Sequence, residues 1–357
     1  MTTKTLIAMS GGVDSSVAAW LVRASGDETA GAVMRLYDPE RSSEPDQTKC
    51  GSSAGIEDAR AAAGQLGIPF YVCDFREVFR EEVIGYFVRS YELGQTPNPC
   101  VECNRRMKFG RLLQFADELG YDRIATGHYA VIEHDAAAGR YLLRKAIDPA
   151  KDQSYVLSAL TQEQLSRTVF PLGGYTKPEI RAIAAELGLI TASKKESQDI
   201  CFVPDGDYVK FIQEYTGRQY PPGDFVDREG HVLGRHRGII RYTIGQRKGL
   251  GLALKKPQYV TALDIPGNRV LLGDNEQLFT RDFEADRFNW IATAPPAGDL
   301  RACARIRYKH REAPATVHPL SETRVHITFD EPQRAITPGQ TVVLYDGDLV
   351  VGGGTIV

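Results

Sequence analysis

The segment from Leu6 to Val17 constrains the fold more than any other part of this chain. It reads as a short apolar strand, a tight turn rich in Ser and Gly, and the start of a helix. A turn of this kind leaves backbone N–H groups directed at whatever lies above it, which makes an anion site. Gly11 and Gly12 permit positive φ and the close approach of a phosphate. Hydroxyl donors are added by Ser10, Ser15 and Ser16.

The charge of Asp14 indicates how the turn would hold an anion. A carboxylate there would repel a phosphate unless a metal ion bridged the two, so the residue suggests Mg²⁺. The segment has neither the GxxxxGK[ST] pattern of a Walker loop nor the G-x-G-x-x-G pattern of dinucleotide sites. S-G-G-x-D-S after a first strand instead resembles the pyrophosphate loop of the ATP pyrophosphatases. Those enzymes cleave ATP between the α- and β-phosphates and adenylylate a carbonyl oxygen.

Strand-like and helix-like segments alternate through the first half of the chain. We predict strands at residues 5–9, 30–36, 70–75 and 123–126, and helices at 15–24, 55–66, 77–93, 105–119 and 177–187. This rhythm is typical of an α/β fold, a parallel sheet with helices on both faces. Ligands bind such folds at the carboxyl ends of the strands, where the Ser/Gly turn, Met34, Gly127 and His128 are expected. Residues 35–55 show little periodicity and are expected to form a mobile loop or flap.

The pattern changes near residue 205. One short helix at 208–215 is followed by Pro/Gly turns and brief alternating strands, and after about residue 278 only strands and turns are expected. The strands expected there are 301–308, 315–317, 324–329, 342–345 and 349–351. We therefore predict a catalytic domain of ATP-pyrophosphatase type at 1–205, a small central β-rich domain at 206–277 and a C-terminal antiparallel β-barrel at 278–357.

The average charge of the chain hides its distribution. The formal net charge is −3, but residues 230–263 contain no Asp or Glu and several Arg and Lys. Residues 301–311 also lack acids, and four basic residues at period two would share one face of a strand there. These residues are Arg305, Arg307, Lys309 and Arg311. With a third basic stretch at 105–111, the pattern favours a polyanionic partner.

No apolar run approaches the length of a membrane span, and the chain leads directly into a strand. We therefore expect a cytoplasmic protein without a leader segment. Six cysteines in such a chain favour thiol or metal chemistry over a disulfide framework. Three of them, Cys50, Cys73 and Cys303, are interpreted as small buried side chains.

Cys100 and Cys103 form a CxxC directly after a Pro-rich turn. We expect Cys103 at the start of a basic helix, where the dipole and the nearby Arg105 and Arg106 would lower its pKa. A zinc site or a redox pair is the usual competing interpretation of a CxxC. A closed zinc site needs four ligands, and no second CxxC or pair of histidines supplies them, although Cys50 is a candidate for the fourth.

Several motifs together give a more specific resemblance. In chain order they are S-G-G-V-D-S-S, T-P-N-P-C-x-x-C-N followed by K-F, A-T-G-H-Y, K-D-Q-S-Y, S-Q-D-I-C-F, Y-T-I-G-Q-R-K-G-L-G and a terminal T-P-G-Q with G-G-G-T-I. From its first strand to its last residues, the chain resembles the bacterial tRNA-specific 2-thiouridylases. These enzymes place sulfur on the wobble uridine of certain tRNAs.

The resemblance implies roles for particular residues. The nucleophilic cysteine of the family corresponds to Cys103, and the cysteine that carries a persulfide corresponds to Cys201. Contacts to ATP are implied for Ala8, Met9, Ser10, Gly11, Gly12, Val13, Asp14, Ser15, Met34 and Gly127. Contacts to tRNA are implied for Asn98, Pro99, Cys100, His128, Lys151, Asp152, Gln153, Arg307, Tyr308 and Gln340. Some members carry an Asp with an acid/base role where this chain has Cys100, and a thiol cannot be assumed to take that role.

The implied reaction suits these residues. Adenylylation by ATP with Mg²⁺ turns the uridine C2 oxygen into a leaving group, AMP, and a cysteine persulfide then supplies the sulfur. The two cysteines end as a disulfide that needs reduction. The implied partners are the anticodon stem-loop of tRNA, held by the basic stretches, and a persulfide-donating protein fed by a cysteine desulfurase.

Three alternatives stay open. Cys100, Cys103 and Cys201 could hold a [4Fe–4S] cluster that delivers sulfide in the same reaction. An ATP pyrophosphatase acting on a small molecule would need neither the distant cysteines nor the basic tail. A tRNA- or metal-binding protein without catalytic activity is disfavoured by the intact phosphate loop.

Overall fold

A five-stranded parallel sheet forms the centre of the first half of the molecule. The computed structural model describes residues 2–37, 52–194, 200–203, 206–254 and 256–357. The strands are β1 (Lys4–Ala8), β2 (Glu28–Arg35), β3 (Phe70–Asp74), β4 (Arg123–Thr126) and β7 (Thr168–Val169). Their order is β3-β2-β1-β4-β7, and every neighbouring pair is parallel. The carboxyl ends of all five strands therefore lie at one edge.

Helices cover both faces of this sheet because successive side chains along a strand point to opposite sides. Ile7 packs with α1 (Val13–Ala24), α2 (Ser53–Leu66) and α9 (Lys177–Glu186) in one apolar cluster. Leu6 packs in another cluster with the helices of the opposite face. Those are α3 (Arg76–Phe79), the π-helix η2 (Arg80–Ile84), α4 (Gly85–Glu92), α5 (Pro99–Cys103), the π-helix η3 (Asn104–Arg111) and α6 (Leu112–Glu118). The predicted fold class is confirmed, and π-helical turns interrupt the two long helices that the sequence predicts.

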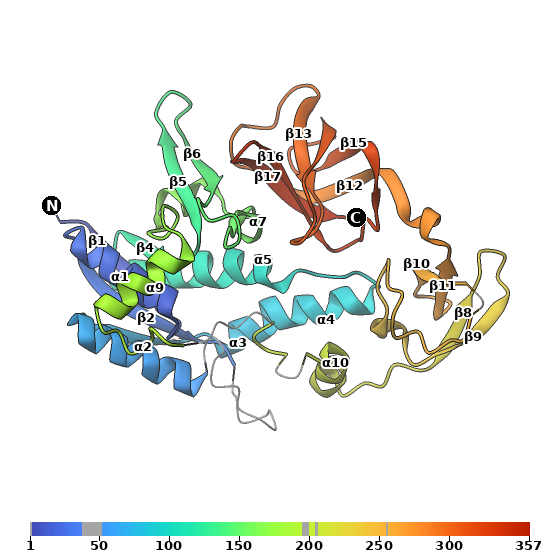
Figure 1. The fold of residues 1–357 in the computed structure, drawn as a ribbon, viewed down its shortest axis with the longest axis horizontal. Coiled ribbons are helices and arrows are strands. Elements are labelled where there is room, and N and C mark those ends of the chain that lie inside the picture. The colour runs from blue at the N-terminus through green and yellow to red at the C-terminus, as the bar shows by residue number, and fades with distance from the viewer. Residues whose placement is uncertain (1, 38–51, 195–199, 204–205, 255) are drawn as a thin grey trace.

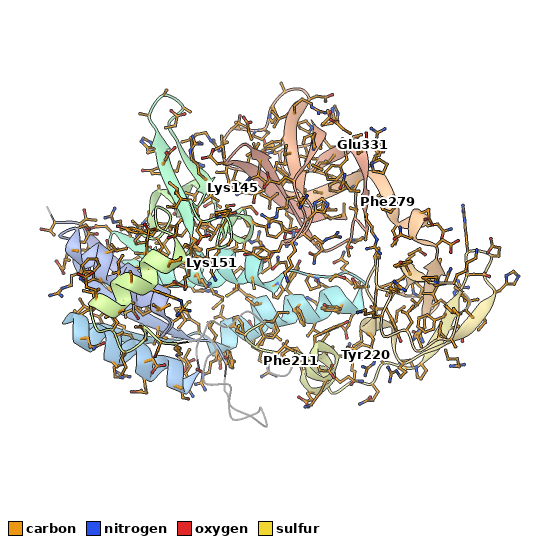
Figure 2. The ribbon with its side chains drawn as sticks, in the orientation of Figure 1. Lys145, Lys151, Phe211, Tyr220, Phe279 and Glu331 are labelled. Atoms are coloured by element: carbon orange, nitrogen blue, oxygen red, sulfur yellow. The ribbon has the colours of Figure 1, made fainter. Side chains whose placement is uncertain are left out.

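A hairpin that the sequence analysis did not predict leaves this domain and reaches the C-terminal barrel. It consists of β5 (Ala130–Asp135) and β6 (Arg140–Lys145), followed by the short helices α7 (Ser154–Leu157) and α8 (Gln162–Ser166). Leu349 of the barrel pairs with Arg144 of the hairpin. Lys145, labelled in Figure 2, donates to Glu312 Oε2 at 2.8 Å and to the carbonyl oxygen of Gly347 at 2.9 Å. The first domain and the barrel thus share main-chain and side-chain contacts.

The central region is a small β-rich unit. After α10 (Tyr208–Thr216), the strands β8 (Gly223–Val226), β9 (Val232–His236), β10 (Tyr259–Asp264) and β11 (Arg269–Gly273) form a sheet in the order β10-β11-β8-β9. The short 3-10 helices η4 (Ile239–Arg241) and η5 (Asn275–Leu278) flank it. In Figure 1 this unit lies beyond the end of α4, on the side of the molecule opposite β1.

The C-terminal strands close into a barrel. They are β12 (Phe279–Trp290), β13 (Leu300–Arg305), β14 (Ala313–Pro319), β15 (Val325–Arg334), β16 (Thr341–Asp346) and β17 (Leu349–Ile356). The order β12-β15-β14-β13-β16-β17 is closed by pairing of β12 with β17. Inward-facing residues such as Ala304, Val317 and Phe329 fill its core. Figure 1 shows the barrel above the helices that contain α4 and α5.

One predicted strand is wrong at its end. We expected a strand over 301–308, but β13 ends at Arg305 and residues 307–309 form a turn. The guanidinium of Arg305 donates to the carbonyl oxygen of Tyr308, and His310 N donates to Arg307 O at 2.9 Å, so these bonds close a turn instead. The four basic residues of this stretch consequently do not share a strand face.

Two other expectations concern membrane-spanning segments and the flap at residues 35–55. In the part of the chain that the structure describes, no helix combines the length and the apolar character that crossing a membrane requires. Most of the expected flap at 35–55, including Cys50, lies outside the described residues.

Candidate active site

The Ser/Gly turn connects β1 to α1 at the carboxyl edge of the sheet. Gly11 has φ +74°, and a Cβ on it would lie 2.3 Å from the carbonyl oxygen of Gly55 in α2. Gly12 is different: it is the N-cap of α1 with φ −98°, and a Cβ there would meet only Ser10 Oγ, at 3.5 Å. Of the two glycines, only Gly11 therefore uses the positive φ that glycine permits, and the extended backbone of Gly12 is open to any residue.

Two serine hydroxyls brace the turn. Ser15 Oγ and Ser16 Oγ each donate to Gly12 O at 3.0 Å. Ser10 N donates to Ser15 Oγ at 3.1 Å, so Ser15 links both sides of the turn. Ser16 is fully buried, while Ser10 is half-buried. Their shared partner keeps the first N–H groups of α1 in a fixed array at the end of the helix.

Asp14 is paired with a lysine that the sequence analysis did not single out. Lys177 Nζ lies 2.6 and 2.8 Å from the two carboxylate oxygens of Asp14, and Tyr129 Oη donates to the same carboxylate at 2.7 Å. Lys177 is 7% exposed and begins α9. The negative charge at the phosphate loop is thus balanced by an ammonium group. No sequence motif signalled Lys177, because Asp14 and Lys177 lie 163 positions apart.

A recess of about 670 Å³ adjoins this ion pair. Its lining includes three basic residues, Lys151, Lys177 and Arg181, together with Thr176. On the other side of the turn, Lys194 Nζ donates to Gly11 O at 3.0 Å and pairs with Asp58. Lysines therefore approach the phosphate loop from two sides, and each is paired with a carboxylate, Lys177 with Asp14 and Lys194 with Asp58.

The other predicted ATP contacts lie at the same edge of the sheet. Met34 is buried near the end of β2, and Gly127 directly follows β4. A Cβ on Gly127 would come within 2.9 Å of Asp14 C and Ser15 N. The backbone after β4 is therefore too close to the start of α1 for any side chain larger than that of glycine. Ala8 ends β1, Met9 follows it in the turn, and Val13 begins α1. The structure brings all these positions together, as the parallel topology predicts.

The helix that carries the CxxC begins earlier than we expected. Pro99 occupies its first turn, and Asn98 Oδ1 caps it by accepting from Cys100 N at 3.2 Å. Cys100 therefore lies in the N-terminal turn, and Cys103 is the last residue of α5. The placement of Cys103 at the helix start is wrong, because Asn98 and Pro99 together begin the helix four residues before it.

Arg105 and Arg106, which we expected to lower the pKa of Cys103, are bonded to Glu102 instead. Arg105 Nη2 and Arg106 Nε donate to the same carboxylate oxygen of Glu102, at 3.1 and 2.9 Å. Glu102 is 5% exposed, although it lies between the two cysteines. The sequence offered no signal for this buried charge, because a glutamate on a basic helix reads as a surface residue.

Lys108 and His128 connect the cysteine helix to the phosphate loop. Lys108 Nζ lies 3.3 Å from His128 Nε2, and Thr126 Oγ1 lies 2.7 Å from His128 Nδ1. Desolvation, aided by the Lys108 charge, holds the pKa of His128 well below its usual 6.5. The ring is then neutral, and its Nε2 can accept from Lys108 while Nδ1–H donates to Thr126. Because Gly127 abuts Asp14, this chain of contacts joins the two candidate centres.

Cys100 lies near the same ammonium group. Its side chain is exposed, yet desolvation by the surrounding protein raises the pKa of the thiol, and Lys108 opposes that rise. Tyr308 of the barrel lies close enough for Cys100 and Lys151 to affect the pKa of its hydroxyl, which desolvation raises.

Several residues predicted to contact tRNA lie near one another where the base of the hairpin meets the barrel. Tyr308 Oη donates to Asp152 O at 3.4 Å, and Gln153 Oε1 accepts from Tyr129 N at 3.0 Å. Figure 2 shows Lys151 at the base of the hairpin, on the side of the first domain. Arg307 is directed to the carbonyl oxygen of Arg334 at 3.2 Å, and desolvation and Arg334 lower its pKa.

Gln340 meets the cysteine segment itself. Its Nε2 donates to the carbonyl oxygen of Thr96 at 2.8 Å, two residues before Asn98. Thr96 N in turn donates to Pro338 O at 2.9 Å. The predicted residues Asn98, Pro99 and Gln340 therefore lie on one continuous contact between the first domain and the barrel.

Cys201 lies on a short described segment between two gaps. Both it and Cys103 are half-buried and pack against the same apolar cluster. The next residue, Phe202, meets the rings of Phe79 and Phe87 at centroid distances of 5.7 and 5.2 Å. The first three residues of the S-Q-D-I-C-F motif lie outside the described residues. Of the cysteines interpreted as structural, Cys73 is buried and Cys303 is half-buried.

The basic stretch of the central region lines a recess of about 630 Å³. Arg241, Arg247, Lys248 and the ring of Tyr208 contribute to its wall. Within the described ranges, one trio of potential metal ligands has mutually close atoms, namely Asp227, Glu229 and His231 on the exposed β8–β9 connection. The three candidate cysteines do not form such a single-ion site.

Comparisons with known proteins cover the whole chain. A family model described as tRNA methyl transferase HUP domain matches residues 3–205. Two others, described as tRNA methyl transferase PRC-barrel domain and aminomethyltransferase beta-barrel domain, match residues 209–274 and 280–356. The tRNA-specific 2-thiouridylase MnmA of Moorella thermoacetica is 54% identical over 98% of each chain. Its counterparts in Acetivibrio thermocellus and Clostridioides difficile are 49% and 48% identical, over 99% and 100% of this chain and 99% and 98% of theirs.

Proposed function

The chain belongs to the tRNA-specific 2-thiouridylase family, and from this we propose how its residues divide the work of the reaction. The enzyme is a tRNA sulfurtransferase that thiolates uridine with the use of ATP. We assign the target to the C2 position of the wobble uridine. The C2 carbonyl is a poor electrophile, so the chain must supply an activating centre and a sulfur centre.

The activating centre is the phosphate loop. The N–H groups at the start of α1 and the lysines on both sides of the turn bind the phosphates of ATP. The uridine C2 oxygen attacks the α-phosphorus, and pyrophosphate leaves. Asp14 is an oxygen ligand suited to Mg²⁺, which would neutralise charge on the departing pyrophosphate. Lys177 holds Asp14 until the nucleotide arrives and then turns to the phosphates.

The sulfur centre consists of Cys103 and Cys201. The terminal sulfur of a persulfide on Cys201 forms a bond to C2, and AMP leaves from the same carbon. The Cys103 thiolate then attacks the inner sulfur of Cys201, which releases the thiolated base and leaves a Cys103–Cys201 disulfide. An external thiol reductant returns both cysteines to thiols. The persulfide comes from a sulfur-donating protein supplied by a cysteine desulfurase.

The remaining predicted residues hold the tRNA. Asn98, Pro99 and Cys100 would face the target base. That base must leave its stack to reach the two reaction centres. His128, Lys151, Asp152, Gln153, Arg307, Tyr308 and Gln340 would contact the anticodon stem-loop, together with the basic recess of the central region. We keep the division into domains at 1–205, 206–277 and 278–357 as part of this proposal.

One observation carries the proposal: the phosphate loop and the cysteine helix adjoin each other. Gly127 lies against Asp14 and Ser15, and the next residue, His128, contacts Lys108 of the cysteine helix. This link supports our proposal that a base activated at the first centre reaches a thiol at the second. This adjacency has no use in an ATP pyrophosphatase that acts on a small molecule without sulfur transfer.

The iron–sulfur alternative uses the same residues. The donor set of three thiols, two of them on one helical turn, suits a [4Fe–4S] cluster, and Cys100, Cys103 and Cys201 would hold it. When bound, such a cluster would offer an open iron to sulfide. We prefer the persulfide route, which needs only Cys103 and Cys201 and no cluster.

The test compares cysteine variants under conditions in which free sulfide is absent. Cys103→Ala and Cys201→Ala should each abolish thiolation of tRNA with ATP and a persulfide donor, while ATP binding stays intact. Cys303→Ala is the matched control and should keep wild-type activity. Full thiolation by either of the first two variants would refute their roles. Iron and acid-labile sulfide bound stoichiometrically after anaerobic purification would replace the persulfide route with the cluster.

A further inference from the structure

A buried carboxylate lies between the two cysteines of the CxxC. The side chain of Glu102 is 6% exposed and accepts hydrogen bonds from three guanidinium groups. Arg105 and Arg106 come from the same helical segment and share Oε2. The third donor, Arg287, belongs to the C-terminal barrel and reaches Oε1 at 3.2 Å. A charge this buried persists only when it is well paired, so the contact from the barrel is part of what keeps Glu102 in place.

The backbone of β12 is shaped to deliver Arg287 to this carboxylate. The pairing of β12 with β17 shifts between Asp286 and Asn289, so one extra residue is accommodated there as a β-bulge. Arg287 has φ +52°, a conformation that L-residues rarely adopt. The neighbouring Phe288 remains in the barrel core while Arg287 is directed outward to α5. A bulge that re-aims one side chain is typical of a functional position.

Two further contacts fix the guanidinium of Arg287. Its Nη2 donates to Thr355 Oγ1 at 2.8 Å within the barrel and to Tyr86 Oη at 3.3 Å on α4. The guanidinium carbon also lies 5.4 Å from the centre of the Tyr86 ring. Arg287 thus spans β17, α4 and α5 with one rigid group, which a flexible ammonium could not do.

The barrel holds the other end of the cysteine segment as well. Gln340 and Pro338 bond to the main chain of Thr96, and a Cβ on Gly339 would lie 2.8 Å from Gln95 Cβ. The segment 96–103 is therefore held by the barrel at Thr96, before Cys100, and at Glu102, directly before Cys103. The two contacts come from separate parts of the barrel, β12 and the turn before β16.

We infer that the C-terminal barrel positions the two CxxC thiols, and that Arg287, through Glu102, is a positioning residue for sulfur transfer. The inference rests on the proposed function, and it gives the barrel a task beyond contact with tRNA. Arg287 touches neither the sulfur atoms nor the base. Its loss should disturb the orientation of Cys100 and Cys103 while the tRNA-contacting surface of the barrel remains.

The experiment uses the full chain with Arg287→Met, Arg287→Lys and a matched control, Arg324→Met. Arg324 lies in the same barrel and pairs with Glu284 and Asp286 of β12, but these contacts stay within the barrel. The first measurement is the rate at which iodoacetamide alkylates Cys100 and Cys103, followed by peptide mass spectrometry without ATP or tRNA. The second is the pair kcat and KM for tRNA in thiolation.

For Arg287→Met we expect the alkylation rate of at least one of the two thiols to change by about threefold or more, and kcat to fall about tenfold, because small misplacements are costly. KM for tRNA should stay within about twofold, since binding is retained. Arg287→Lys should lie between Arg287→Met and the wild type, and Arg324→Met should match the wild type in both measurements. Arg287→Gly, in which the φ of +52° suits the residue, replaces Arg287→Met if that variant does not fold.

Wild-type alkylation rates and wild-type kcat in Arg287→Met would overturn the inference. Equal losses in Arg287→Met and Arg324→Met would also overturn it, because they would show a general effect on the barrel. The alkylation measurement requires no sulfur transfer. If the wild-type chain failed to thiolate tRNA, the proposed function would fail while the alkylation rates still decided the positioning role.

Discussion

Replacing Gly11 by Ala should damage the protein far more than replacing Gly12, although both belong to the same motif. At Gly11 the φ of +74° places an L-residue in the left-handed region, at about 1–2 kcal/mol. The added Cβ would also lie 2.3 Å from the carbonyl oxygen of Gly55, a backbone atom that cannot rotate away. Such overpacking costs about 1–3 kcal/mol. We therefore expect Gly11→Ala to lower the free energy of unfolding of the first domain by about 3 kcal/mol.

Gly12→Ala meets neither obstacle. Its φ of −98° is ordinary, and the nearest atom to a new Cβ is Ser10 Oγ at 3.5 Å. Reduced freedom of the unfolded chain stabilises such a variant by about 0.4–1 kcal/mol. The poorer N-cap preference of Ala offsets this by a similar amount. The net change should therefore be close to zero.

Thermal unfolding followed by circular dichroism measures the difference. About 3 kcal/mol in a domain of this size corresponds to a fall in Tm of roughly 6–12 °C for Gly11→Ala. Gly12→Ala should unfold within about 2 °C of the wild type. Equal Tm values for the two variants, or a larger loss for Gly12→Ala, would refute the assignment of the conformational constraint to Gly11.

Four other predictions concern buried charges and thiols. Lys177→Met should raise the KM for ATP about 10- to 100-fold, since a charge-assisted hydrogen bond contributes about 1.5–3 kcal/mol, and an unchanged KM would contradict its role at the phosphates. Asp14→Asn should lower Tm because it leaves the buried Lys177 ammonium without its carboxylate, and an unchanged Tm would contradict this. The pKa of His128 lies well below the 6.5 of the unfolded chain, so the unfolded state binds the extra proton and stability falls as pH drops through 6.5; His128→Gln should flatten that fall in denaturant titrations. Burial raises the pKa of Cys73 to about 12, so iodoacetamide at pH 8 should label Cys100 and leave Cys73 unmodified, as peptide mass spectrometry would show.

The sequence predicted the helices and strands that are determined by neighbouring residues in the chain. The alternation of strands and helices and the strand–turn–helix around Gly11 predicted the parallel sheet and the Ser/Gly turn at its carboxyl edge, and the structure confirms both. The barrel was predicted from its short strands and turns. The strand end at Arg305 was not, because a period-two pattern encodes neither the Arg305 side-chain bond to Tyr308 nor the main-chain bond from His310 to Arg307 that close the following turn.

The site residues that were missed depend on contacts between distant parts of the chain. Lys177 meets Asp14 across 163 positions, and Arg287 meets Glu102 across 185. A lysine at the start of a helix and a glutamate beside two arginines both resemble surface residues in the sequence. The helix start was misplaced for a local reason, since Asn98 as a cap and Pro99 in the first turn were available as signals and indicate the observed beginning of α5.

The most direct test of the proposed reaction is to incubate the wild-type chain with tRNA, ATP and a persulfide donor. Mass spectrometry then measures the nucleosides and the nucleotide products. We predict 2-thiouridine at the wobble position only in the presence of ATP, with one AMP and one pyrophosphate formed for each thiolated base. Thiolation without ATP, or the release of ADP and phosphate in place of AMP and pyrophosphate, would contradict the claim that the phosphate loop activates the uridine oxygen by adenylylation.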